Sequence, residues 1–224
     1  MYIVTGLTKM QNNRVCMSVY DEENNCYRRP IFLRDPITYH TVQNITLFSI
    51  IELTPIHHQH NIISPHTEDF PVEDTTQFTQ IGRLNTNEQI KLLKKISVPS
   101  VIDVFGYDDN NTPFLTQQRG RFFVWPNSGI RSLGTVQAQE ARLYEDDFGK
   151  IRVDFTDLTG QSYNNLPFVS IEQDHWKDRR SYINKFNRTS ANEIFVRLSL
   201  SRPFQPSNWG QRACFLQVSC IHRY

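Results

Sequence analysis

Residues 197–224, RLSLSRPFQPSNWGQRACFLQVSCIHRY, contain two apolar runs on either side of a loop. Apolar and polar side chains alternate before and after a central loop, which is the pattern of half-buried strands. Two prolines stiffen this loop. The stretch therefore predicts a hairpin whose last strand closes a β domain. Its Arg/Trp loop has two interpretations, a surface that contacts a ligand or a lid that folds back on the end of the barrel.

The rest of the chain also favours strands. It has 224 residues with 15 Phe and 9 Tyr, whereas alanine, the best helix former, is scarce. This length fits two domains of about 100 residues each, or one large β domain. We expect a mostly β protein.

Turn residues divide the chain into two similar halves. The first 84 residues contain about five predicted strands, and the pattern of Ile90, Leu93 and Ile96 predicts a helix near residues 86–97. A loop, DDNNTP, follows at residues 108–113, and the second half again predicts about five strands. We therefore predict two tandem small Greek-key barrels of the OB type, residues 1–108 and 109–224, with a short helix between or capping them. Two β-sandwiches are the alternative architecture.

The sequence predicts a cytoplasmic protein that does not enter a membrane. The N-terminus has no basic region followed by an apolar one, and no apolar run approaches the roughly 20 residues of a membrane span. The four cysteines show no CxxC spacing, so we expect four reduced thiols and no disulfide.

Several segments carry a resemblance to a known family. They are PHTEDF at residues 65–70, RSLGTV at 131–136, KIRVDFTDLTGQSYNNLPF at 150–168, and the closing pair VRLSLSRPF and CFLQVSCIH. In this order they resemble the dual-OB domain proteins of bacteria, over nearly the whole chain. The resemblance implies two tandem OB barrels, a role in binding nucleic acid, and an association with prokaryotic conflict and defence systems.

Charge is distributed unevenly between the two halves. Residues 1–118 have 9 basic and 13 acidic side chains, and residues 119–224 have 15 basic and 10 acidic ones. A polyanion that binds this chain is therefore expected to meet the second half.

Two strands of the second half combine cations with aromatic rings. RGRFFVWP, residues 119–126, alternates so that arginines and rings share one face, and KIRVDF, residues 150–155, has a basic outer face. Cations suit phosphates and ring faces suit unstacked bases, as single-stranded nucleic acid requires. The alternative is that the rings enter the barrel core. The predicted nucleic-acid contacts are Arg119, Arg121, Phe123, Trp125, Arg131, Lys150, Arg152, Arg197, Arg202, Trp209 and Arg212.

A histidine-rich stretch, PIHHQHNIISPHTEDF at residues 55–70, raises the question of a metal. His58, His60 and His66 are weak candidate ligands, but their spacing matches no recurring metal motif. We predict no metal and no cofactor. The sequence also shows no nucleophile with an ordered base.

Three hypotheses of function follow in order of preference. The first is a non-catalytic module that binds nucleic acid, single-stranded in particular, as an accessory of a bacterial defence or conflict system. The second is a protein-interaction adaptor with a partner from the same system. The third is a metal-dependent hydrolase that uses the histidine and carboxylate cluster.

Overall fold

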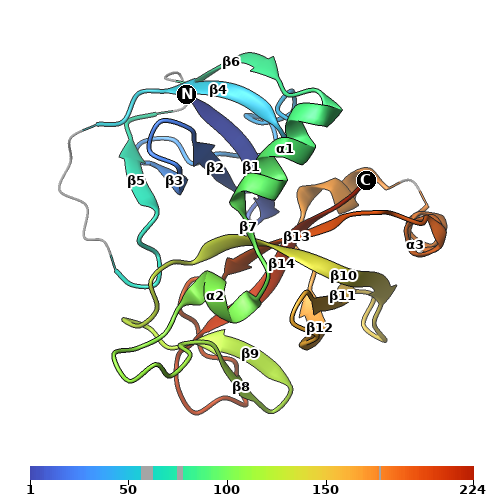
Figure 1. Cartoon of the computed structure of the whole chain (residues 1–224). Helices are drawn as coiled ribbons and strands as arrows, with labels where there is room; N and C mark the ends of the chain where they lie inside the picture. The colour runs from blue at the N-terminus through green and yellow to red at the C-terminus, as the bar shows by residue number, and fades with distance from the viewer. Residues whose placement is uncertain (57–62, 75–77, 177) are drawn as a thin grey trace. The chain divides into compact units, whose positions relative to one another are not determined.

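A computed structural model describes the chain except residues 57–62, 75–77 and 177 (Figure 1). Contacts between residues divide it into two compact units, residues 1–62 with 68–92, and residues 63–67 with 93–224. The predicted boundary between residues 108 and 109 stays a prediction. Both units consist mainly of strands, which confirms the predicted fold class.

The first unit is a curled sheet of six strands. They are β1 (Tyr2–Lys9), β2 (Val15–Asp21), β3 (Cys26–Phe32), β4 (Ser49–Leu53), β5 (Asp69–Val72) and β6 (Phe78–Arg83), in the order β5-β3-β2-β1-β4-β6. β5 runs parallel to β3, and a bridge between Val72 and Pro55 joins β5 to the chain just after β4. The strands β1, β2, β3, β5 and β4 thus follow one another around a closed ring, as in an OB barrel.

A buried ion pair holds β5 against β3. Arg29 Nη1 donates to Asp69 Oδ1 at 3.1 Å, and each side chain is only 4% exposed. Burial alone would lower the pKa of Arg29, but nearby Cys16, Asp69 and Glu68 raise it, so the guanidinium stays charged. Removing one member of such a pair leaves the other as an uncompensated buried charge.

Helix α1 (Thr86–Ile96) lies where the sequence predicted a helix. Asn85 Oδ1 accepts from the Glu88 backbone N–H at 3.1 Å, and Glu88 Oε2 accepts from the Asn85 backbone N–H at 2.8 Å. This reciprocal capping box satisfies two donors at the start of the helix.

The second unit is built on an eight-stranded sheet with short helices. The strands are β7 (Ser97–Val98), β8 (Thr116–Gln118), β9 (Arg121–Val124), β10 (Leu133–Glu145), β11 (Ile151–Asp157), β12 (Ser162–Pro167), β13 (Ile194–Leu200) and β14 (Cys214–Arg223). The helices are α2 (Val101–Phe105), a 3₁₀ helix (Ile171–His175) and α3 (Arg179–Arg188).

Five of these strands form a closed barrel. β10 pairs with both β11 and β13, β11 pairs with β12, and β13 pairs with β14. A parallel bridge between Phe168 and Val218 then joins the end of β12 to β14. The hairpin predicted at the end of the chain therefore supplies the last two strands of the ring, in the connectivity of an OB barrel.

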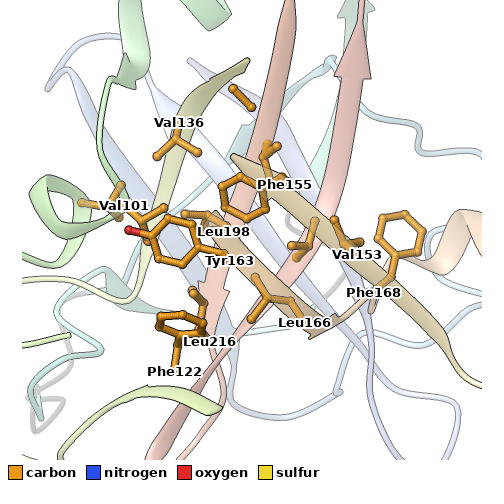
Figure 2. Packing of buried hydrophobic residues seen from close by; sticks show 14 of the residues in the cluster. Val101, Phe122, Val136, Val153, Phe155, Tyr163, Leu166, Phe168, Leu198 and Leu216 are labelled. Atoms are coloured by element: carbon orange, nitrogen blue, oxygen red, sulfur yellow. The ribbon is translucent and has the colours of Figure 1, made fainter. Parts of the chain in front are cut away.

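The barrel core follows from alternation along its strands. β11 buries Ile151, Val153, Phe155 and Asp157 and leaves the residues between them half-buried. Figure 2 shows Phe155 beside Tyr163, whose rings stack with centroids 5.1 Å apart. Burying each large apolar side chain contributes about 1.5–3 kcal/mol, so this core provides much of the stability of the unit.

The four cysteines are free, as predicted. In the part of the chain that the structure describes, no helix is long and apolar enough to cross a bilayer.

Close packing of α2 on β10 predicts the effect of a small substitution. A Cβ at Gly134 would lie 2.2 Å from Cγ1 of Val104, so we expect Gly134→Ala to destabilise the second unit by about 1–3 kcal/mol. All three tryptophans belong to this unit, so tryptophan fluorescence during urea denaturation reports on it. Gly210→Ala is the control, since no atom lies within 4 Å of its added Cβ. Equal midpoints for the two variants would contradict the packing.

The buried ion pair predicts a larger loss in the first unit. Asp69→Ala leaves Arg29 buried without its carboxylate partner, and we expect a loss of about 3–5 kcal/mol. Hydrogen exchange of β1–β3 measures it. The control is Glu73→Ala, which removes an ion pair whose Arg34 side chain is 70% exposed and should cost at most about 1 kcal/mol. An equal fall in protection in both variants would show that the buried ion pair contributes no more to stability than the exposed one.

Candidate nucleic-acid interface

A pocket of about 320 Å³ lies on the second barrel where β9, β11, β12 and β14 approach one another. We call it the basic pocket. Its lining residues are Gly120, Arg121, Phe122, Lys150, Arg152, Asn165, Leu166, Pro167, Phe204, Phe215 and Leu216. Three cations predicted from two separate strands, Arg121, Lys150 and Arg152, thus meet in one place. The lining includes no carboxylate.

The β8–β9 hairpin brings Arg121 to the basic pocket. The hairpin turns through Arg119 and Gly120, which have φ values of 50° and 72°, and β9 then pairs with β14. Alternation along β9 directs Phe122 into the main core and Phe123 into a second cluster with Trp209 and Phe215. Arg121 precedes them at the exposed start of the strand.

Aromatic rings support the arginines of this hairpin. The Arg121 guanidinium carbon lies 5.7 Å from the centroids of both the Trp209 and Phe215 rings. Arg119 lies 6.0 Å from the Trp209 ring, and its Nη1 donates to the Asn208 carbonyl at 3.0 Å. These cation–π contacts orient Arg121 without an acidic partner among the described residues, so no carboxylate there neutralises its charge.

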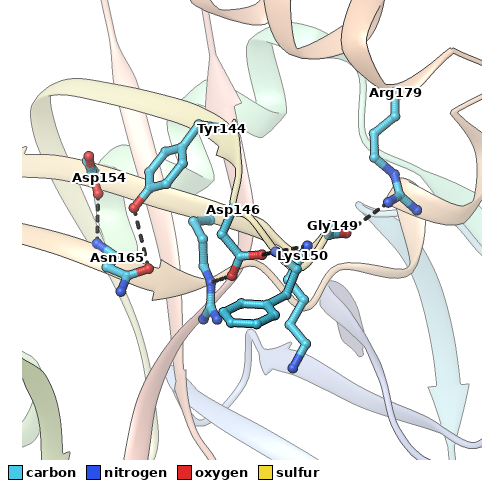
Figure 3. Close-up of polar contacts among 9 residues, drawn as sticks. Tyr144, Asp146, Gly149, Lys150, Asp154, Asn165 and Arg179 are labelled. Atoms are coloured by element: carbon cyan, nitrogen blue, oxygen red, sulfur yellow. Dashed lines mark hydrogen bonds and ion pairs between the residues drawn. The ribbon is translucent and has the colours of Figure 1, made fainter.

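The turn between β10 and β11 places Lys150 and Arg152. Asp146 accepts from the backbone N–H groups of Phe148 and Lys150 at 3.0 and 2.9 Å, and from Arg152 Nε at 2.7 Å (Figure 3). These bonds, that from the Lys150 N–H foremost, lower the pKa of Asp146, which keeps it ionised near neutral pH. The carboxylate partly neutralises Arg152 and leaves Lys150 as a cation on the rim.

A β-bulge in β12 shapes the opposite wall. Asn165 has a φ of 57°, and two residues of β12 oppose one of β11 between the pairs Val153–Leu166 and Phe155–Tyr163. Asp154 Oδ1 accepts from the Asn165 backbone N–H at 2.7 Å, which replaces the lost ladder bond (Figure 3). Bulges of this kind redirect side chains beside functional sites.

The loop at residues 201–213 contributes a ring to the basic pocket and a lid to the barrel. Phe204 is 47% exposed and lines the pocket, while Arg202 and Arg212 are exposed. Trp209 is only 5% exposed, and its ring meets Phe123 and Phe215 edge to face. Of the two interpretations of this loop, Trp209 fits the lid, and Phe204 is the ring that a ligand can reach.

Other predicted contacts lie elsewhere. Phe123 is fully buried, Trp125 is half-buried against the same cluster, and Arg131 is exposed but does not line the basic pocket. Arg197 was expected on an outer face of the hairpin, but both faces of β13 are buried and Arg197 is 1% exposed. Its Nη1 donates to the carbonyls of Gly134 and Leu198, so it serves the structure of the sheet.

The histidine candidates do not form a described metal site. His58 and His60 lie outside the described residues. His66 is 2% exposed, with Nε2 3.9 Å from the buried Cys214 Sγ, whose pKa burial raises to about 11. Within the described ranges, no three His, Cys, Asp or Glu side chains are arranged to hold a metal ion.

Sequence reasoning named Arg121, Lys150 and Arg152 but missed the other lining residues of the basic pocket, among them Asn165, Phe204 and Phe215. Phe204 was within reach, since it lies in the Arg/Trp loop between the two prolines. Asn165 belongs to an Asn-Asn pair, and Asn tolerates the left-handed conformation that a bulge needs. Phe215 gave no separate signal, because an apolar residue in a predicted strand indicates a core position.

Comparison with known proteins agrees with this geometry. A family model described as the dual OB-containing domain matches residues 7–221. Searches of curated proteins and of solved structures gave no match. The matched range includes the strands of both barrels, in accord with the closure described above. The chain therefore belongs to the dual OB-containing domain family.

Proposed function

We propose that this chain is a non-catalytic module that binds single-stranded nucleic acid through the basic pocket of its second barrel. The observation that carries this proposal is the meeting of Arg121, Lys150 and Arg152 with the rings of Phe204 and Phe215, without a lining carboxylate. The pocket lies between the β10–β11 turn, the β11–β12 face and the β13–β14 loop. OB barrels bind oligonucleotides with this face and these loops.

The chemistry of the lining supports binding over catalysis. Among its residues are no Asp, Glu, His, Cys, Ser or Thr, so the pocket offers no nucleophile with a general base. The exposed ring of Phe204 beside these cations also favours nucleic acid over a protein partner, because an unstacked base needs a ring face to stack on. An acidic protein would need the cations alone.

We further propose a cytoplasmic accessory of a bacterial defence or conflict system. The resemblance of the motifs to bacterial dual-OB proteins supports this role. Deletion of the gene from its host should lower resistance to phage in a plaque assay, and unchanged plaque counts across a phage panel would contradict it.

Binding should depend on salt in a way that Lys150 modulates. Each phosphate contact contributes a slope of about −0.7 in a plot of log K against log salt for a single strand. We expect labelled oligothymidine to bind at low salt, and Lys150→Ala to weaken binding and reduce the magnitude of the slope by about 0.7. Fluorescence anisotropy from low to moderate salt measures both.

Lys91→Ala is the matched control, since it removes another exposed lysine, from α1 in the first unit. We expect it to leave affinity and slope unchanged. Absence of binding at low salt, or the same slope for wild type and Lys150→Ala, would overturn the proposed site.

A further inference from the structure

A phenylalanine projects from the turn beside the basic pocket. Phe148, at the tip between β10 and β11, is 85% exposed, the largest exposure among the exposed large apolar side chains described. Covering an exposed apolar ring with another flat apolar surface is favourable, because it removes both surfaces from water. The ring is therefore suited to contact a ligand, and it lies two residues before Lys150, which lines the pocket.

The turn that carries Phe148 is held from both sides. Asp146 accepts the Phe148 N–H on one side. On the other, Arg179 of α3 donates to the Gly149 carbonyl at 3.1 Å and pairs with Glu145 at 3.4 Å (Figure 3). The backbone is thus organised before a ligand arrives, which reduces the entropy lost on binding.

A second pocket also borders this turn. Its volume is about 540 Å³, and it lies between β10 and α3, with Asp146 and Gly149 of the turn in its lining. Arg142 and Arg180 line it and are exposed, and neither has an acidic partner among the described residues. The acidic groups of its lining, Glu145 and Asp146, are already engaged by arginines.

The helix beside this second pocket is also basic. α3 has the sequence RRSYINKFNR, with four cations and no acid. Asn187 fixes the helix to β10, because its side-chain amide accepts from the Leu143 N–H at 3.0 Å and donates to the Leu143 carbonyl at 2.8 Å. Cations therefore flank Phe148 on both sides of a braced turn.

We propose that a single strand bound in the basic pocket crosses the β10–β11 turn, stacks one base on Phe148, and continues past Arg142 and Arg180 beside α3. This inference rests on the proposed function and extends it from a pocket to a path. It assigns three further contacts. It also explains a preference for single strands, since the bases of a duplex are already stacked on each other.

The experiment compares short and long strands. Oligothymidines of about 4 and about 12 nucleotides, within the site sizes of OB folds, are titrated against the full chain and followed by anisotropy. We expect Arg142→Ala/Arg180→Ala to leave the short strand unaffected. For the long strand the salt slope should fall in magnitude by about 1.4, the loss of two phosphate contacts.

Phe148 variants test the stacked base. We expect Phe148→Leu to bind the long strand at least about 5-fold more weakly than wild type, because base stacking is lost. The salt slope should stay unchanged, because the substitution removes no phosphate contact. Phe148→Tyr should restore the affinity, since it keeps a ring. Tyr107→Ala, which removes a ring 40% exposed elsewhere in the unit, is the control and should have no effect.

The outcomes separate the path from the site. If wild type binds neither strand at low salt, the proposed function and the path both fail. If wild type binds and Lys150→Ala reduces the slope, only the path is overturned when the Arg142/Arg180 variant affects both lengths equally or neither, or when Phe148→Leu binds the long strand as tightly as wild type does. Since a longer strand offers more binding registers, tighter binding of the long strand is not itself the readout.

Discussion

Alternation of side chains along β9 is the constraint on which the basic pocket depends. Because successive residues point to opposite faces, Phe122 completes the barrel core while Phe123 completes a separate aromatic cluster with Trp209 and Phe215. Arg121 is on the same face as Phe123, so its guanidinium lies over the Trp209 and Phe215 rings. A shift of one residue would reverse all three positions and remove a cation from the pocket.

Buried aromatic rings therefore position the exposed cations on this surface. The Trp209 ring is enclosed, and two arginines lie over it. It sets the position of the guanidinium groups. The Asp146 carboxylate has the corresponding task in the β10–β11 turn, where three donated hydrogen bonds hold the chain on either side of Phe148. Rigid support of this kind lets a few side chains carry most of a binding energy.

Much of the fold could be predicted from local patterns. The helix at α1 follows from its apolar spacing and cap, and the closing hairpin follows from the alternation in residues 194–223. The basic faces of two strands were likewise visible as alternating letters. Burial of Arg197 was not visible, since alternation states which residues share a face and not whether something covers that face. Nor did any pattern separate a ring that lines a pocket, such as Phe204, from one that is buried in an aromatic cluster, such as Trp209.

Strand periods, turn residues and charge distribution are local properties, and the printed chain is sufficient to establish them: two sets of strands, a capped helix, and a basic second half. The site depends on contacts between residues far apart in sequence. Arg121, Lys150 and Phe204 meet only because β14 pairs with β9 on one side and bridges the end of β12 on the other. Closure of a barrel is a long-range event that no local period encodes, and so the pocket exists only in the folded chain.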